Sequence, residues 1–160
     1  MDRFIGAALQ TIPLMPDGKL DTEVPNRPRT YRVLAHHMFR IPEAFVEVAG
    51  GAFFGQGLPT EVAREPDMAS TATLAAYGQG VRDKVAAWWA GKADKSCKET
   101  VQTYYGPQSL HEVLERATWH IGQHCRQWMM LLDMAGVRFE RPLADSDFAD
   151  LPMPKQVWDG

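Results

Sequence analysis

The chain has 160 residues, a formal net charge of −3, 45% apolar residues and 23% charged residues. This length suits one domain over residues 1–160, and the mixture is typical of a globular protein rather than a disordered chain, a collagen-like repeat or a membrane protein. No apolar run approaches the ~20 residues of a membrane-spanning helix, and no cluster of Lys and Arg favours nucleic-acid binding.

The first part of the chain, residues 1–27, is predicted to be an irregular N-terminal segment that contains one short helix. That helix covers residues 2–10 and places its apolar side chains on one face. Residues 11–30 contain four prolines and one glycine, which predicts an irregular path. Because this connection is long, we expect it to wrap around the core or to line a site.

The first long helix is predicted over residues 30–49, with Thr30 or Asn26 as its N-terminal cap. Pro42 removes one backbone hydrogen bond and is expected to bend the helix. The apolar stripe recurs every three or four residues, and its members are Leu34, Met38, Ile41, Phe45 and Val48.

A connector over residues 51–69 leads to a second long helix over residues 70–90, capped by Ser70 and ended by Gly91. Residues 91–108 are polar and rich in turns, and the run TVQTYY within them is a candidate short strand.

The last helix begins with a capping box, in which Ser109 and Glu112 each satisfy the free backbone N–H of the other. It ends at Gly136, and residues 137–160 are predicted to be an irregular tail. Three long helices, one short helix and long loops predict an all-α bundle.

The strongest chemical signal in the last helix is the pair His120 and His124. A spacing of four residues places both imidazoles on one helix face, where they can chelate one metal ion. The zincin motif is excluded, because Ile121 stands where that motif needs a glutamate. Both histidines lie within the apolar stripe, and a shared metal would satisfy two of their ring nitrogens, although two ordinary core histidines are the alternative.

The first long helix adds His37, which falls on its core-facing stripe, whereas His36 lies nearer the polar side and is expected to face solvent. Three inward histidines on two helices, without an acidic partner, indicate a facial three-histidine site with an open position for water or substrate. His36 and His37 differ by one position along the helix, so His36 is the alternative ligand. A second alternative is that His37 is buried but binds no metal.

Residues near these histidines have two interpretations each. Gln127 can orient a ligand or bond a metal-bound water, or make an ordinary helix–helix hydrogen bond. Arg126 and Arg116 are expected on a solvated face, although either can receive a substrate carboxylate. Cys125 is expected to be a packed thiol and His111 a surface residue. Six aromatic residues form core and rim, and a few of them can wall a substrate pocket: Trp88, Trp89, Trp119, Trp128, Tyr104 and Tyr105.

The pattern His37 … His120-x-x-x-His124-x-x-Gln127 resembles the DinB/YfiT-like superfamily of four-helix metalloproteins. LAHHMFRIPEAF is similar to the second helix of that family and LHEVLERATWHIGQHCRQWMMLL to its last. The resemblance covers roughly residues 28–160 and implies a DinB-like four-helix bundle. The first helix departs from it, since the family usually has a full-length one. Either this helix is short or the chain begins inside a longer architecture.

The resemblance also implies a divalent metal (zinc, nickel or iron) on His37, His120 and His124, with a water or thiolate in the open position. Characterised relatives use such a metal to bind a low-molecular-weight thiol, such as glutathione, for transfer to an electrophile or for isomerisation. We therefore expect a thiol-dependent transferase or isomerase that acts on a small electrophile, with no catalytic side chain beyond the metal-bound nucleophile. A stress-related metal-binding protein without turnover and a metal-dependent hydrolase are the alternatives.

The protein partners and the cellular compartment are predicted from weaker sequence signals. The tail DLPMPKQVWD is similar to a branch of the family in which a DinB domain follows a glutaredoxin-like module, and this implies a glutaredoxin-like partner. Family members often pair through their helices, so a homodimer is expected. The N-terminus lacks a signal-peptide pattern, and the two cysteines are too few for a disulfide framework, which predicts a cytoplasmic protein.

Overall fold

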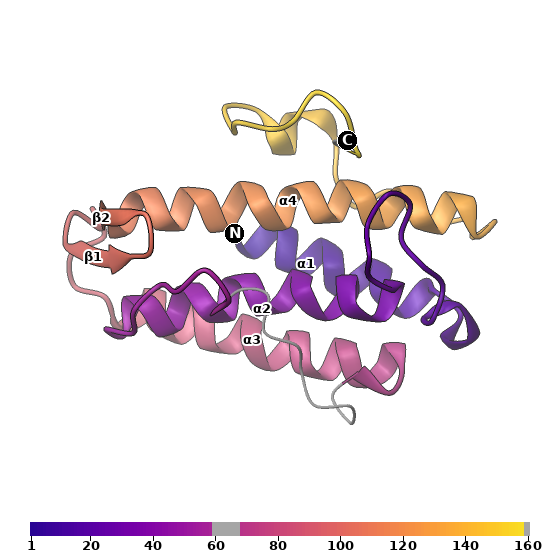
Figure 1. The fold of residues 1–160 in the computed structure, drawn as a ribbon, viewed down its shortest axis with the longest axis horizontal. Helices are drawn as coiled ribbons and strands as arrows, with labels where there is room; N and C mark the ends of the chain where they lie inside the picture. Colours follow the sequence, from indigo (N-terminus) through magenta and orange to yellow (C-terminus); the bar gives the residue numbers. More distant parts are fainter. Residues whose placement is uncertain (59–67, 159–160) are drawn as a thin grey trace.

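The computed structural model describes residues 1–58 and 68–158, and within these it shows four helices and one two-stranded hairpin (Figure 1). The helices are α1 (Asp2–Thr11), α2 (Tyr31–Ala49), α3 (Thr71–Gly91) and α4 (Leu110–Met134). Helices α1 and α2 each pack against both α3 and α4. The predicted four-helix bundle with a short first helix is therefore confirmed. Parts of the predicted connector (59–67) and tail (159–160) lie outside the described residues.

The N-terminal segment is more regular than predicted. Helix α1 buries Phe4 and Ile5 in the main core, and it is followed by two 3₁₀ turns, η1 (Ile12–Leu14) and η2 (Asp17–Lys19). The predicted short helix over residues 2–10 is therefore confirmed, and the two 3₁₀ turns add short regular pieces to the connection that was predicted to be irregular. A 3₁₀ turn needs only three or four residues, so it fits into a proline-rich segment, and η1 itself contains Pro13.

The predicted helix starts are confirmed in detail. The Thr30 hydroxyl accepts a hydrogen bond at the start of α2, and the helix continues through Pro42 to Ala49. Helix α4 begins at the predicted capping box, where the Ser109 hydroxyl accepts from the Glu112 N–H and the Glu112 carboxylate accepts from the Ser109 N–H. These caps fix where the histidine-bearing helices begin.

The hairpin at one end of the bundle qualifies the prediction of an all-α protein. Strand β1 (Thr100–Thr103) covers the first part of TVQTYY and pairs antiparallel with β2 (Gly106–Ser109). Strand β2 was not predicted, because its sequence GPQS lacks the β-branched and aromatic residues that mark strands. Its turn places Gly106 at φ 111°, a conformation that glycine adopts without strain.

Two apolar clusters fill the bundle, and the histidines lie where they meet. The larger cluster includes Leu34 and Trp128, and the smaller one, on the hairpin side, includes Ile41 and Ala117. His37 lies between Leu34 and Ile41 along α2. Apolar packing on both sides therefore holds this turn of the helix in place.

The tail after α4 turns back and runs along that helix (Figure 1). Gly136, at φ 75°, makes the reversal, and a 3₁₀ turn, η5 (Asp145–Phe148), interrupts the otherwise irregular path that the sequence predicted. Phe148 stacks on Phe4 of α1, with ring centroids 5.4 Å apart. The tail is thereby fastened to the bundle rather than left in solvent.

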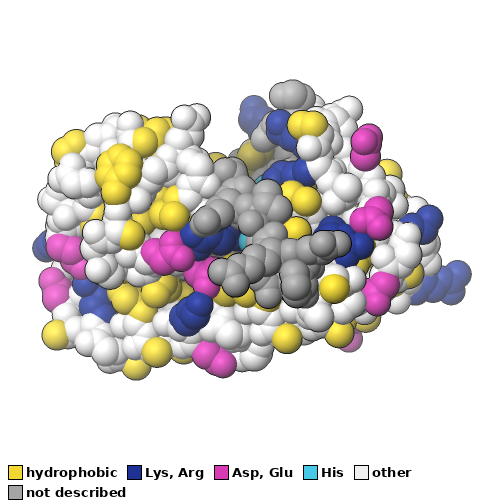
Figure 2. Space-filling model, turned by 60° about the horizontal axis from the view of Figure 1, so that its bottom comes forward, with side chains coloured by type: hydrophobic (Ala, Val, Ile, Leu, Met, Phe, Trp, Pro, Cys, Tyr) yellow, Lys and Arg dark blue, Asp and Glu magenta, His cyan; other side chains and the backbone are white. Residues whose placement is uncertain are grey.

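Basic and acidic side chains are interspersed on the face drawn in Figure 2 rather than gathered into a patch of one sign. Across the described residues, every helix is too short or too polar to pass through a lipid bilayer.

Candidate metal centre

Three histidine side chains converge between α2 and α4. His37, His120 and His124 each offer one ring nitrogen, and these nitrogens all lie within 4.8 Å of one another. The ring centroids are 4.8–5.4 Å apart. This spacing suits one cation between the rings if the nitrogens draw in to the Zn–N distance of about 2.0–2.1 Å. We call these three residues the histidine trio.

The protonation of His124 is set by a chain of hydrogen bonds that starts in the tail. The Nε2 of Gln127 donates to the carbonyl of Val157 at 3.0 Å, so the Oε1 of Gln127 faces His124 Nδ1 at 2.6 Å. Assigned from this network, Nδ1 carries the proton and Nε2 presents its lone pair. That Nε2 is buried and has no hydrogen-bond partner among the described residues.

An unpartnered buried nitrogen of this kind is rare, because desolvation without a hydrogen bond is unfavourable. A cation between the three rings would satisfy it together with the nitrogens of His37 and His120. The donor set also fits, since neutral imidazole is a common ligand of zinc, nickel and iron. The residues present therefore suit the metal that the DinB resemblance implies.

The electrostatics of the site keep the rings of His120 and His124 neutral. Burial, followed by the charges of Arg116 and Arg29, lowers the pKa of His120 to about 4. Burial, followed by the neighbouring histidines and Arg29, lowers the pKa of His124 well below its ordinary value. Both rings are thus deprotonated at pH 7, and a metal ion has no proton to displace from them.

The stability of the metal-free protein should fall as the pH drops from 6.5 to 4. In this window the unfolded chain protonates His120 near its ordinary pKa of 6.5, whereas the folded protein resists protonation until about 4. The unfolded state then binds more protons, so the free energy of unfolding decreases with falling pH. Urea denaturation at several pH values measures this slope. His120→Gln should flatten it, whereas the exposed His111, changed to Gln, should leave it as in the wild type. Equal slopes in both variants would contradict the assignment.

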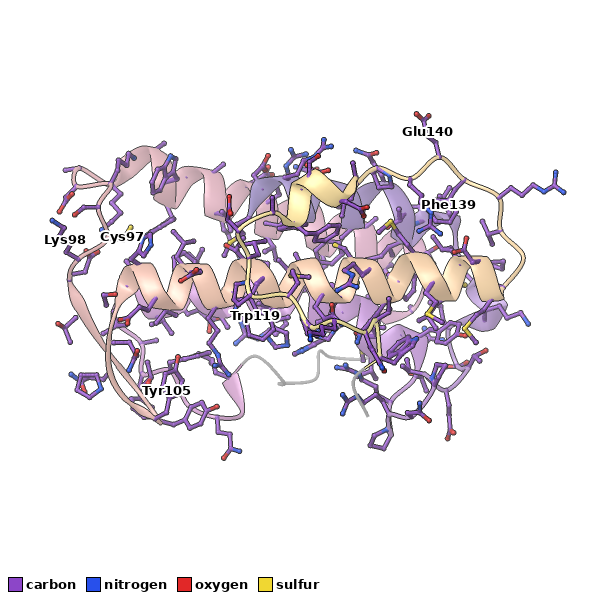
Figure 3. The ribbon with its side chains drawn as sticks, turned by 90° about the horizontal axis from the view of Figure 1, so that it is seen from above. Cys97, Lys98, Tyr105, Trp119, Phe139 and Glu140 are labelled. Carbon is purple, nitrogen blue, oxygen red and sulfur yellow. The ribbon has the colours of Figure 1, made fainter. Side chains whose placement is uncertain are left out.

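The trio opens into a pocket of about 490 Å³ between the loop before α2, helix α4 and the tail. Trp119 lines this pocket, and Figure 3 shows it on α4 close to where the tail crosses. The expectation that residues 11–30 line a site is confirmed by the last residues of that segment. The residues that line the pocket are Arg27, Pro28, Arg29, His37, Trp119, His120, Gln123, His124, Gln127 and Pro154.

The expectation that His36 faces solvent is wrong. Its side chain is only 4% exposed, and its ring stacks on Tyr77 of α3 with centroids 4.9 Å apart. Helix α2 packs against both α3 and α4, so it has two buried faces rather than one. His37 takes the face toward α4 and joins the trio, whereas His36 takes the face toward α3.

The other predicted site residues differ in how close they lie to the trio, and Arg116 lines a small cavity together with His120. Gln127 contacts the trio through His124. Arg126 donates to the Gln123 side chain and to the carbonyl of Pro154, so it holds the tail. Arg116 lies over the ring of Tyr105, with its Cζ 5.2 Å from the ring centroid.

The structure agrees with the expectation that Cys125 is a packed thiol and that most of the aromatic candidates lie outside the pocket. Cys125 is buried with its thiol against the carbonyl of Phe4, and burial raises the pKa of that thiol, so it is a packed rather than a reactive group. His111 is exposed, as expected. Of the six aromatic candidates, Trp119 alone is among the described residues that line the pocket, and Trp128 is in the core.

Two functional candidates were missed by the sequence interpretation. Gln123 donates to the carbonyl of Val157 at 2.7 Å, which fastens the tail beside the trio. Arg29 lines the pocket from the irregular loop before α2. Neither lies on a periodic pattern that would distinguish it, because both roles depend on contacts between segments far apart in the sequence.

Together, the helical bundle and the inward trio define a protein with a histidine cluster suited to one metal ion. No protein-family profile and no curated protein matches the chain. The crystal structure of a DinB-like protein from Bacillus cereus ATCC 10987 matches it with a TM-score of 0.68 and 18% identity, covering 86% of this chain and 89% of that one. The chain therefore has the DinB-like fold that the sequence predicted. The glutaredoxin-linked branch, the homodimer and the cytoplasmic location stay predictions.

Proposed function

We propose that this protein is a DinB-like metalloenzyme. It either transfers a low-molecular-weight thiol to a small electrophile or uses the thiol to isomerise that electrophile. His37, His120 and His124 would hold one divalent cation, and all three line the pocket from which a substrate would reach it. The observation that supports this most strongly is the buried, unpartnered Nε2 of His124 beside two further imidazoles.

A divalent cation on three neutral ligands lowers the pKa of a thiol or water bound to it, and so supplies a nucleophile at neutral pH. The chain's own residues shape the space around it. Gln127 orients His124, and Trp119 forms an apolar wall of the pocket. Asp and Glu are absent from the described residues that line the pocket, so none of those residues offers a carboxylate as a general base. This favours a nucleophile that needs no protein base.

A metal analysis combined with a thiol panel tests the proposal. The protein should purify with, or be reconstituted to, about one zinc, nickel or iron per chain, as three histidines converge on one point. Turnover of a chromogenic aryl halide should require both the metal and a thiol such as glutathione. Turnover in water alone would instead indicate a hydrolase, and a loaded metal without turnover would indicate a binding protein.

Changing Gln127 to Met should weaken metal binding by about 10–100-fold, because hydrogen bonds to the ligating histidine orient it and set its tautomer. Competition with a chromophoric chelator measures the affinity. Gln123→Met is the matched control, since the Gln123 side chain also bonds the tail, whereas the described hydrogen bond of His124 goes to Gln127. If both variants lose affinity equally, the effect comes from loosening the tail rather than from the orientation of His124.

A further inference from the structure

Arg29 is a pocket residue whose side chain has no ion pair among the residues that the structure describes. Its side chain is half-buried, and its Nε is fully buried without a hydrogen-bond partner among the described residues. Burial, followed by the neighbouring charge of Arg27, lowers the pKa of Arg29, but a guanidinium stays charged at neutral pH. A buried N–H donor without an acceptor is unfavourable for folding, so the placement of this Nε beside the pocket calls for another explanation.

Arg29 lines the same pocket as the three residues of the histidine trio. Its charge is among the groups that lower the pKa of both His120 and His124. The pocket also has Arg27 on its wall and no Asp or Glu among its described lining residues. A divalent cation on the trio would add to the positive charge of Arg29, and an anionic ligand would complement both charges.

The loop presents Arg29 in a fixed backbone conformation. The N–H of Val24 donates to the carbonyl of Arg29 at 2.9 Å, and the N–H of Arg29 donates to the carbonyl of Arg27 at 2.9 Å. Asn26, at φ 57°, supplies the left-handed residue that closes the turn, a conformation that asparagine tolerates. A β-bridge between Glu23 and Thr30 closes the loop just before α2. The arginine is therefore held over the pocket by its backbone rather than by a partner for its side chain.

We propose that Arg29 is the anion-binding residue of this pocket and that its ligand is a small molecule bearing a carboxylate. The planar guanidinium presents paired N–H donors that match the two oxygens of a carboxylate. A pocket of about 490 Å³ takes a small molecule rather than a macromolecule. Where the proposed metal function also holds, the ligand is a thiol acid, with its sulfur toward the trio and its carboxylate on Arg29. That second part rests on the proposed function, whereas the anion site itself does not.

The anion site is tested first in the metal-free protein. In a ¹⁵N,¹H spectrum, the Nε–H signal of Arg29 is assigned by its loss in Arg29→Gln, and sodium acetate is added at constant ionic strength. A saturable shift of this signal, absent from the exposed Arg141, is the expected result. Inorganic phosphate is the second probe. Saturation by phosphate but not acetate would overturn the carboxylate assignment, and no saturation by either would overturn the anion site.

The ligand class is tested in cobalt(II)-loaded protein, whose visible spectrum reports a thiol at the metal. Two thiol acids, mercaptoacetate and 3-mercaptopropionate, are compared with uncharged 2-mercaptoethanol. At least one acid should bind about tenfold or more tightly than the neutral thiol, since a charge-assisted hydrogen bond is gained. Arg29→Gln should remove this preference and Arg141→Gln should keep it.

The failures of the two proposals are distinguishable. Equal affinity of all three thiols in the wild type would overturn the role of Arg29 in ligand selection, although the cobalt spectrum would still support the metal site. If cobalt does not bind, the proposed metal function fails, and the acetate titration still decides the anion site. Thermal unfolding of Arg29→Gln should show no loss of stability, because the Nε that the variant removes has no hydrogen bond among the described residues.

Discussion

Replacing His37 by alanine is expected to weaken binding of a divalent cation by more than about 100-fold. Loss of a group that merely orients a ligand already costs 10–100-fold, and here a ligand itself is removed. Two histidines on one helix turn would remain, and they leave the ion without its donor from α2. Metal content after dialysis and competition with a chromophoric chelator measure the effect.

His36 provides a control one residue away. It is as buried as His37, but its ring stacks on Tyr77 and points away from the trio. We expect His36→Ala to keep its metal while losing stability, because it leaves a cavity between α2 and α3. Circular dichroism and thermal unfolding separate the two effects. Metal lost by His36→Ala and kept by His37→Ala would reverse the assignment of the ligands.

The second large effect is expected from Gly78→Ala. A Cβ at this position would lie 2.3–2.5 Å from three ring atoms of Phe39, which is itself fully buried. The ring has no free space to move into, so we expect a destabilisation of about 3 kcal/mol, at the upper end of overpacking effects. Glycine to alanine inside a helix otherwise stabilises, and the clash reverses that sign.

Gly80 lies on the same helix two residues later and is the matched control. It is exposed, and an added Cβ would meet nothing within 4 Å. Gly80→Ala should therefore raise the free energy of unfolding by about 0.5–1 kcal/mol, through the lower backbone entropy of the unfolded chain. Urea denaturation of the two variants measures both changes. Stabilisation by Gly78→Ala would show that α3 and α2 are less tightly packed than this structure has them.

Much of the fold could be predicted from the sequence, because its helices depend on patterns between residues that are close in the sequence. Ser109 and Glu112 are three residues apart, and this spacing alone indicates the start of α4. The apolar stripes of α2 and α4 likewise depend on a period of 3.6 residues. Strand β2 could not be predicted in this way. Its residues have little strand propensity, and they are extended because β1 offers them backbone partners.

The candidate site likewise has features that follow from local sequence patterns and features that depend on contacts between distant segments. The spacing of His120 and His124, and the position of His37 on its stripe, follow from helix geometry, and the structure places the three side chains together. His36 was misplaced because its burial depends on Tyr77, which belongs to another helix. Arg29 was missed because loops have no periodicity to relate their residues to the core. Arg29 can be recognised as a pocket residue only from the residues that surround it in three dimensions.

The tail contributes only main-chain oxygen atoms to the hydrogen bonds described beside the trio. Gln123, Arg126 and Gln127 donate to carbonyls of Pro154, Gln156 and Val157. Every amino acid offers the same carbonyl, so these bonds place no demand on which side chains stand there. Selection can therefore let this stretch diverge between lineages while the imidazole beneath it keeps its orientation.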